Sequence, residues 1–562
     1  MRKAYLFLVL VATSSLVLLE AGATPVRNNG GMVISASAIA SRVGAAVLKD
    51  GGNAVDAAVA TAFALAVTHP SAGNIGGGGF LLYRAASGDA DAYDFRETAP
   101  AKASPTMFLT NGQYDGDAHH KGYLSVGVPG TVAGLHLAWK ERGRLRWKRL
   151  VEPAVHLARN GFPISDDLAR SLAEVLPEMR KFPSSVEQFS KNGVPYSAGE
   201  LLKQPVLATT LQRIANDGPS AFYDGPIAAA FQREMLAHGG LITREDMKRY
   251  TAVRRVALRG TYRGFEVLAM PPPTSGGVAL IEILNMLEGY DLSSMGPGSA
   301  AAVHVMVESM KRAFADRARW LGDPDFNRDM PLARLLSKPY AADLRKTINE
   351  ARATRSSPSV FDWPMETKET THFSVVDSQR NAVSMTYTIE EAYGVKIVLP
   401  GGGFLLNNEM GDFNGGPDLT TTEGLIGTAA NLAQPGKRML SSMSPTILAR
   451  DGRLFMVTGS PGGRTIINTV VETVVNVIDF GMNAQEAVDA GRFHHQWLPD
   501  RIAHEPFALS PDTLAGLRAK GHEVLQSGSQ GVAEVIVFDA TKDELNGGVD
   551  RREPDGGAAL LR

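Results

Sequence analysis

Apolar positions are concentrated in the first part of the chain, where they predict two helices and a strand. Residues 32–48 are rich in Ala, Val and Ile and predict a helix that ends before a Gly-Gly pair. Asn53 is suited to cap a second helix over 54–67, which is apolar on almost every face. We therefore expect this second helix to be buried on all sides. A glycine-rich turn at 73–79 and a strand at 80–83 follow.

The central part of the chain has the spacing of amphipathic helices. Residues 130–260 are expected to be mainly helical. The clearest helical segments are 131–141, 150–159 and 166–179. A strand is predicted at 262–270 and a long helix at 300–321.

The pattern changes to strands after a polar segment, 349–369, which we interpret as a loose linker. Residues 372–377 and 381–388 predict a β-hairpin with a tight turn between them. Further strands are predicted at 443–450 and 454–458, and a helix at 465–480. Because helices and strands are mixed through both halves, we expect an α/β (α+β) fold with helical layers over sheets.

The N-terminus has the pattern of a secretory signal peptide over residues 1–23. Arg2 and Lys3 precede an apolar run from Leu6 to Leu19, and a small-residue cleavage signal ends at Ala23. A retained membrane anchor is the alternative, but the run is shorter than the ~20 residues that span a bilayer. The sequence therefore predicts an exported chain, periplasmic or secreted, without a stable membrane span.

Composition and charge exclude several classes of function. Lys+Arg is 57 and Asp+Glu is 59, so no basic surplus exists to bind nucleic acid. The absence of cysteine excludes disulfides and thiolate metal sites, and the histidine pairs lack metal-ligand spacing. The glycine run 73–79 lacks the Gly-Lys-Ser/Thr ending of a phosphate loop and precedes a strand. It is interpreted as close backbone packing or a wall near a small ligand. No metal or cofactor is predicted.

The junction between the linker and the hairpin carries candidate chemistry. A hydroxyl needs a base before it can act as a nucleophile. If the bond between Glu369 and Thr370 were cut, Thr370 would have an α-amine with a pKa of roughly 7.7–8.0, which could serve its own hydroxyl as the base. The alternative is that Thr370 and Thr371 simply begin a strand, as β-branched residues often do.

Several motifs, in order along the chain, resemble the gamma-glutamyltranspeptidase family. The stretch from Thr370 to Asp377 resembles the start of that family's small subunit, and Gly459–Gly463 reads Gly-Ser-Pro-Gly-Gly. Further matching segments are Asn53–Ala58, Gly73–Gly79, Arg96–Pro100, Asn407–Phe413 and Lys437–Thr446. The resemblance implies a four-layer αββα sandwich of the N-terminal-nucleophile hydrolase type. It also implies a heterodimer made by self-cleavage between Glu369 and Thr370, with a large subunit 24–369 and a small subunit 370–562.

The resemblance also implies a role for each matching residue. Thr370 would be the catalytic nucleophile, and Thr388 a second threonine that assists processing. Gly462 and Gly463 would supply an oxyanion hole through their backbone N–H groups. The substrate's α-carboxylate and α-ammonium would be bound by charged and hydroxyl side chains. Arg96, Ser441 and Ser442 correspond to the carboxylate ligands, and Glu409 and Asp412 to the ammonium ligands.

Three positions depart from the family pattern. Glu390 stands where many members have Asn, so three carboxylates would surround one cation, and one of them is expected to be protonated or turned away. Met439 stands where Pro is usual, with little expected effect. Glu423 stands where some members have an aromatic lid residue, which leaves the balance between water and amine acceptors open.

The implied activity is γ-glutamyl transfer from glutathione or a related amide, to water or to an amino acid or peptide acceptor. No cofactor is needed. One alternative is a related acylase acting on glutaryl or cephalosporin side-chain amides, which shares the fold and the self-cleavage. The other alternative is a processed but catalytically silent homologue. Carboxylates at 409 and 412 favour a substrate with an α-amine, which a glutaryl group lacks.

Overall fold

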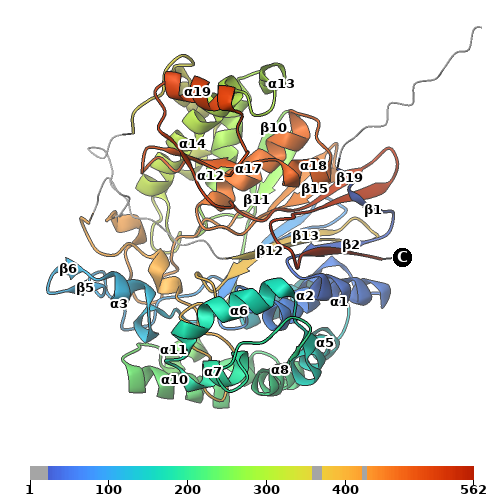
Figure 1. Cartoon of the computed structure of the whole chain (residues 1–562), viewed down its shortest axis with the longest axis vertical. Helices are drawn as coiled ribbons and strands as arrows, with labels where there is room; N and C mark the ends of the chain where they lie inside the picture. The colour runs from blue at the N-terminus through green and yellow to red at the C-terminus, as the bar shows by residue number, and fades with distance from the viewer. Residues whose placement is uncertain (1–22, 357–369, 420–426, 562) are drawn as a thin grey trace, which may run out of the picture.

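Two seven-stranded antiparallel sheets form the centre of the computed structural model, which describes residues 23–356, 370–419 and 427–561 (Figure 1). The first, here called the hairpin sheet, contains in spatial order β21 (Gly557–Leu560), β2 (Met32–Ser35), β12 (Thr371–Val376), β13 (Ala382–Thr388), β3 (Gly78–Arg84), β4 (Ala90–Asp94) and β9 (Val253–Arg255). The second sheet contains β1 (Val26–Asn28), β20 (Glu544–Val549), β19 (Glu534–Asp539), β15 (Arg453–Thr458), β14 (Thr446–Arg450), β11 (Phe265–Ala269) and β10 (Leu258–Tyr262).

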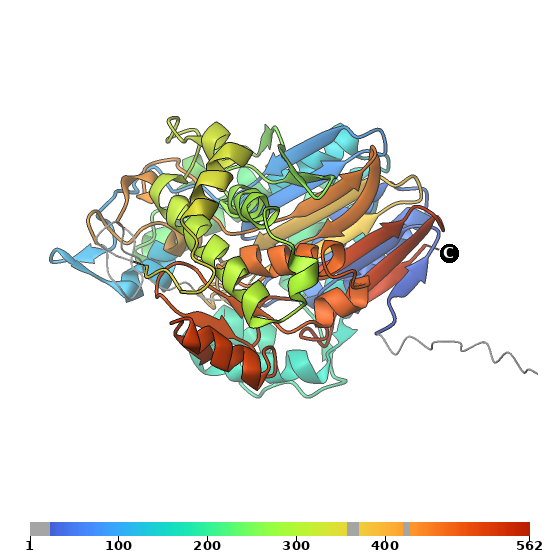
Figure 2. The same ribbon diagram turned by 90° about the horizontal axis from the view of Figure 1, so that it is seen from above.

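The two sheets pack face to face, and helices cover their outer faces (Figures 1 and 2). The hairpin sheet is covered by α1 (Ala38–Lys49) and α2 (Ala54–Thr68), with α4 (Thr131–Arg142), α5 (Trp147–Asn160) and α8 (Pro205–Asp217) beside α2 or behind it. The second sheet is covered by α12 (Gly276–Leu287), α14 (Ala300–Trp320), α17 (Thr465–Ile478) and α18 (Ala484–Asp489). This order of layers confirms the predicted αββα sandwich.

Shorter elements lie around the four layers. The helices are α3 (Gly116–His120), α6 (Asp166–Met179), α7 (Pro183–Phe189), α9 (Ser220–Tyr223), α10 (Pro226–His238), α11 (Arg244–Arg249), α13 (Leu292–Met295), α15 (Leu332–Leu335), α16 (Lys338–Lys346) and α19 (Pro511–Ala519). The small strands are β5 (Leu109–Thr110), β6 (Gln113–Tyr114), β7 (Phe162–Pro163), β8 (Leu201–Leu202), β16 (Phe493–His494), β17 (Ile502–His504) and β18 (Val524–Gln526). In the described part of the chain, no helix combines the length and hydropathy that a bilayer crossing requires.

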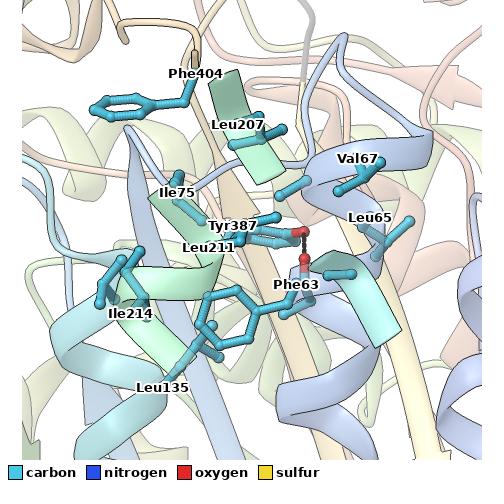
Figure 3. Close-up of a cluster of buried hydrophobic side chains, with 14 of the residues drawn as sticks. Phe63, Leu65, Val67, Ile75, Leu135, Leu207, Leu211, Ile214, Tyr387 and Phe404 are labelled. Atoms are coloured by element: carbon cyan, nitrogen blue, oxygen red, sulfur yellow. Dashed lines mark hydrogen bonds between the residues drawn. The ribbon is translucent and has the colours of Figure 1, made fainter. Parts of the chain in front are cut away.

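Helix α2 confirms the prediction of an all-round buried helix. The side chain of Asn53 accepts hydrogen bonds from the first turn, and Asp56 completes a capping box. Every residue of α2 is buried. One side of the helix packs with Tyr387 of the hairpin sheet, whose hydroxyl donates to the Ala62 carbonyl at 2.9 Å (Figure 3). The strand that ends at Thr388 is therefore fixed from behind by the helical layer.

The predicted helix over 32–48 is wrong at its start. Met32–Ser35 forms strand β2, which pairs with β12 on one side and β21 on the other. The helix begins only at Ala38, where the Ser37 side chain caps it by accepting from the Ala40 N–H. All four residues of β2 are buried, so they lack the alternation that marks a half-exposed strand. A short apolar run of this kind does not distinguish a helix from a strand.

The strand predicted over 262–270 is also divided differently. Tyr262 ends β10 and Phe265 begins β11, and the two residues are paired across a tight turn. Arg263 and Gly264 make this turn with positive φ angles of 51° and 83°. Apolar residues stand on both sides of this turn, so the hydrophobic pattern does not reveal it. By contrast, the predicted hairpin is confirmed as β12 and β13, which pair in register from Thr371 to Thr388.

Candidate active site

The hairpin register brings Thr370 and Thr388 together. Thr370 directly precedes β12, Thr388 is the last residue of β13, and their neighbours Thr371 and Tyr387 face each other across the pair. The Thr370 hydroxyl donates to the Thr388 hydroxyl at 3.4 Å, and the Glu390 N–H donates to that same Thr388 oxygen at 2.9 Å. Both threonines are more than nine-tenths buried. A hydroxyl pair is therefore held at the end of two central strands.

The glycine run 73–79 is the packing surface for the end of β13. The Asn74 amide donates to the Thr388 carbonyl at 2.9 Å, and its oxygen accepts from the Gly77 N–H at 2.9 Å. A Cβ at Gly77 would lie 2.0 Å from the Thr388 carbonyl oxygen, which no side chain permits. The expectation of close backbone packing is confirmed, and the packed strand is the one that carries Thr388.

Arg96 lies after β4 and is completely buried. Its guanidinium is paired with the carboxylates of Glu409 and Asp412, and its Nη1 is 3.7 Å from Glu97 Oε2. Its Nε also donates to the carbonyl of residue 439, and its Nη2 to the carbonyl of residue 440, each at 3.3 Å. One buried cation therefore holds three carboxyl groups and a loop of the chain in place.

Burial and crowding shift the ionisation of this group. Burial raises the pKa of Glu409 well above its usual value, Arg96 opposes the shift, and Asp412 and Glu390 add to it. Burial also raises the pKa of Glu97. For Arg96, burial alone would lower the pKa, but the neighbouring carboxylates outweigh it and keep the pKa above its ordinary value. The raised pKa of Glu409 has the direction expected if one of Glu390, Glu409 and Asp412 is protonated.

Ser441 and Ser442 are held by the helical layer over the second sheet. The Ser441 carbonyl accepts from the N–H of Ser275 at 2.8 Å and from its hydroxyl at 2.6 Å. Arg317, on α14, donates through Nε to the Ser275 hydroxyl at 2.7 Å and through Nη2 to the Ser442 hydroxyl at 2.9 Å. A buried arginine thus positions the serine loop.

The turn at Gly462 and Gly463 precedes α17. Both glycines have positive φ, 128° and 56°, which favours glycine at each position. The Gly462 carbonyl accepts from the N–H and the hydroxyl of Thr465, at 3.1 and 2.7 Å. Ser460, just before the turn, accepts from the Val532 N–H at 2.9 Å and donates to the carbonyl of Pro461 at 2.7 Å. The turn is therefore fixed from both ends.

Most of the predicted site residues line one cavity, here called the Thr370 cavity. Its lining comprises Arg96, Thr370, Thr388, Glu390, Asp412, Ser441, Ser442, Met443, Gly463 and Ile466. Glu409 is not in the lining and reaches the cavity through its pair with Arg96. Gly462 faces a second cavity on the other side of the turn. Five segments far apart in the sequence therefore converge beside the hydroxyl pair.

Glu390 has a strained backbone. Its φ is 72°, in the left-handed region that Asn adopts more easily than Glu. Its carboxylate lies 3.2 Å from Nδ1 of His120, on α3. Glu in place of Asn at position 390 thus adds a charge to the wall of the Thr370 cavity. It also makes the left-handed backbone at this position less favourable.

Sequence reasoning missed the residues that support the site. Glu97, Ser275 and Arg317 are fully or almost fully buried and polar, and none belongs to a motif with a readable mechanism. The only sequence signal for Glu97 is its place beside Arg96. Ser275 stands in a Pro-Pro-Pro-Thr-Ser-Gly-Gly stretch that marks a turn without revealing its partner. Supporting contacts of this kind depend on the tertiary fold.

Two side-chain clusters of metal-ligating type lie elsewhere in the described structure. One contains His304, Glu308 and His522, and the other Asp167, Glu553 and Asp555. In the first cluster, His304 Nδ1 lies 2.7 Å from His522 Nε2. Glu308 already pairs with Lys311 and Arg312. The carboxylate of this cluster therefore already pairs with two cations of the protein.

Some predictions fall on residues outside the described ranges. These are the signal peptide up to residue 22, Glu369 of the cleavage junction, and Glu423.

Comparisons with known proteins agree on one family. The family model described as gamma-glutamyltranspeptidase matches residues 40–560. The glutathione hydrolase proenzyme of Escherichia coli is 48% identical over 539 residues, covering 94% of this chain and 92% of that protein. The structure of a cephalosporin acylase from Bacillus halodurans superposes with a TM-score of 0.84 at 26% identity, covering 98% of this chain and 99% of that one. A Helicobacter pylori gamma-glutamyltranspeptidase covers 56% of this chain and 91% of its own, with a TM-score of 0.56 and 43% identity. This chain belongs to the gamma-glutamyltranspeptidase family.

Proposed function

We propose that the protein is a self-processing γ-glutamyltransferase and glutathione hydrolase whose nucleophile is Thr370. One observation carries the proposal. A threonine hydroxyl at the start of a central strand shares a cavity with a buried arginine, carboxylates and two serines. These are the groups that an α-amino acid head group needs, placed beside a group that can attack an amide.

Processing comes first in this account. The Thr370 hydroxyl adds to the carbonyl carbon of Glu369, the peptide bond to the Thr370 nitrogen breaks, and that nitrogen takes up the proton. The resulting ester is hydrolysed by water, which leaves a carboxylate on residue 369 and a free α-amine on Thr370. The chain becomes a large subunit, 24–369, and a small subunit, 370–562. Thr388 accepts the Thr370 hydrogen bond and orients the hydroxyl.

The transfer reaction then uses the new amine as the base. The Thr370 hydroxyl loses its proton to the amine as the oxygen bonds to the γ-carbonyl carbon of the donor. N–H groups at Gly462 and Gly463 stabilise the oxyanion. The C–N bond breaks and the leaving amine takes the proton, which leaves a γ-glutamyl ester on Thr370. Water releases glutamate, and an amine acceptor forms a new γ-glutamyl amide.

Recognition follows from the charges around Arg96. A γ-glutamyl group carries an α-carboxylate and an α-ammonium. When it enters, its carboxylate pairs with Arg96 and the two serines. Its ammonium then pairs with the carboxylates of Glu409 and Asp412 in place of Arg96. The exchange adds no net charge to a buried site, where an unpaired charge is costly. A glutaryl group would bring a carboxylate without an ammonium, so this balance favours a γ-glutamyl donor.

The acylase alternative has one observation in its favour, the superposition with a cephalosporin acylase over almost the whole chain. Its sequence identity is 26%, against 48% for the E. coli glutathione hydrolase proenzyme. Export to the periplasm or the medium is proposed with the function, because the first 23 residues have the pattern of a signal peptide.

The test measures cleavage and turnover together. Intact-mass analysis of the wild-type protein should give two fragments that divide before Thr370, and γ-glutamyl-p-nitroanilide should be hydrolysed. The Thr370→Ala variant should remain one inactive chain. Cleavage without turnover of this donor, but with turnover of glutaryl amides, would favour the acylase. An uncut wild-type chain would contradict the mechanism.

A further inference from the structure

One face of the hairpin becomes polar towards Thr370 and Thr388. Side chains alternate between the two faces of a strand, so every second cross-strand pair of β12 and β13 shares a face. The face that leads to Thr370 and Thr388 contacts the second sheet. Counted from the far end of the hairpin, its pairs are Val376 with Ala382, Ser374 with Ser384, and His372 with Thr386.

The two polar pairs interrupt an apolar interface. Around them, apolar side chains such as Phe80 of the hairpin sheet and Val457 of the second sheet form the core between the sheets, and Val376 and Ala382 belong to it. The four polar side chains are only 0–1% exposed. Polar groups in such a place cost free energy unless they are hydrogen-bonded. Each of them is therefore expected to have a partner.

His372 is the centre of a directed chain of hydrogen bonds. The Ser374 hydroxyl donates to the Glu534 carbonyl at 2.9 Å, so it accepts from His372 Nε2, which is 3.2 Å away. Burial lowers the pKa of His372 to about 3, so the ring is neutral, and its Nδ1 accepts from the Thr386 hydroxyl at 2.8 Å. Both ring nitrogens and both hydroxyls then have partners, which fixes the orientation of the imidazole.

This chain of hydrogen bonds ends at the segment 459–463, here called the oxyanion turn. The Glu534 N–H donates to the Gly459 carbonyl at 3.3 Å. The His372 ring packs directly against the same residue, since a Cβ at Gly459 would lie 2.3 Å from the ring Cε1. The carbonyl of the preceding residue accepts from the Ser384 hydroxyl at 2.8 Å. The hairpin therefore holds the entrance of the oxyanion turn through several directional contacts.

The separation between the nucleophile and the oxyanion turn depends on how the two sheets are packed. Thr370 directly precedes a strand of the hairpin sheet, whereas the oxyanion turn follows β15 of the second sheet. Apolar burial between the sheets is non-directional, but hydrogen bonds have narrow ranges of distance and angle. A displacement of about 1 Å between reacting groups can cost as much as about 100-fold in rate. The polar pairs therefore lie where a fixed separation matters most.

We propose that His372, Ser374 and Ser384 are positioning residues that set the separation between Thr370 and the oxyanion turn. The inference rests on the proposed function and deepens it. These side chains act through the turn, and they neither touch the substrate nor transfer a proton. The oxyanion forms only during the reaction, whereas the head group of the donor is bound around Arg96. The three residues should therefore affect kcat more than substrate binding.

The experiment separates kcat from binding. Cleaved wild-type enzyme is compared with His372→Phe, Ser374→Ala and Ser384→Ala, using γ-glutamyl-p-nitroanilide as donor. Phe keeps a ring beside Gly459 and has neither nitrogen. We expect kcat to fall about ten-fold in His372→Phe and about three-fold in each serine variant. KM for the anilide and the inhibition constant of L-glutamate should both stay within about two-fold of wild type.

Ser41→Ala is the matched control. The Ser41 hydroxyl is also buried, and it donates to the Gly557 carbonyl at 2.6 Å, away from the oxyanion turn. This variant should lose melting temperature as Ser374→Ala and Ser384→Ala do, and it should keep the wild-type kcat. An equal fall of kcat in the control would show a general effect of lost stability and overturn the inference. So would a wild-type kcat in all three hairpin variants.

Processing is measured first, by intact mass. A hairpin variant that folds but stays uncut, when Ser41→Ala is cut, would assign its hydrogen bond to processing and overturn the inference for that residue. If His372→Phe does not fold, the two serine variants decide. Absence of anilide turnover by cleaved wild-type enzyme would instead contradict the proposed function.

Discussion

Two buried arginines beside the Thr370 cavity have different kinds of partner. Arg96 is completely buried and pairs with the carboxylates of Glu409 and Asp412. Arg317, on α14, donates to the hydroxyls of Ser275 and Ser442. An arginine paired with carboxylates can accept a zwitterion by exchange of ion pairs, whereas an arginine that donates to hydroxyls holds those side chains in place. The comparison assigns recognition of the amino acid head group to Arg96 and positioning of the serine loop to Arg317.

The largest effect should come from Arg96→Gln. Truncating one partner of a buried charge pair between protein and ligand costs about 2–5 kcal/mol of binding, so kcat/KM should fall about 30-fold or more. Because Arg96 serves the γ-glutamyl half, glutathione and γ-glutamyl-p-nitroanilide should be affected alike. Steady-state kinetics on cleaved enzyme measures this. A loss confined to one donor would contradict the assignment of the amino acid head group to Arg96.

A smaller loss is expected for Ser442→Ala. The Ser442 hydroxyl lines the Thr370 cavity and accepts a hydrogen bond from Arg317. Loss of its hydrogen bond to the substrate's α-carboxylate should raise KM about ten-fold for both donors. Ser444→Ala is the matched control, since the Ser444 hydroxyl supports the same loop through the Ser442 carbonyl and does not line the cavity. Equal KM values in the two variants would argue against a binding role for Ser442.

Glu390→Asn should stabilise the protein slightly. Asn tolerates the left-handed backbone at φ 72°, so the free energy of unfolding should rise by about 1 kcal/mol. Removing this carboxylate also removes a charge that helps to raise the Glu409 pKa. Glu390→Gln is the control, because it removes the charge and keeps the backbone cost. Denaturant unfolding of both variants separates the two contributions, and a gain in Glu390→Gln alone would contradict the backbone argument.

The smallest effect concerns pH. Burial raises the pKa of Glu97, so the folded protein keeps a proton that the unfolded chain loses near about pH 4.3. The stability from this group is therefore fully present below that pH and is lost as pH rises towards the folded pKa. Glu97→Gln should flatten the fall in melting temperature as pH rises above about 4.3. The exposed Glu245→Gln should leave the slope unchanged, and an unchanged slope in both would contradict the assignment.

Local patterns predicted the elements that carry the site. The Asn53 cap predicted α2, and the strand pattern with a tight turn after the polar linker predicted the hairpin that brings Thr370 to Thr388. The ordered motifs predicted which distant segments meet, and most of the site residues predicted from them line one cavity. These features depend on residue type and spacing, so they can be read directly from the sequence.

Other features depend on packing that the sequence does not encode locally. In the sequence, the residues of β2 look like the start of a helix. In the fold, they form a strand buried between two others. Arg317 reaches the serine loop from a helix 125 positions away from Ser442 in sequence. The cavity that Gly462 faces joins the N-terminus of α17 to residues around β17 and Gln530, and no motif links them. Each of these requires the tertiary structure.

The most direct test of the central claim is to trap the γ-glutamyl ester on the enzyme. Cleaved wild-type protein is mixed with γ-glutamyl-p-nitroanilide, quenched in acid within the first turnover and digested for peptide mass mapping. The account predicts that the peptide beginning with Thr370 gains the mass of one γ-glutamyl group, and that the gain disappears when Gly-Gly is added before the quench. Rapid p-nitroaniline release with the adduct on another residue would contradict it.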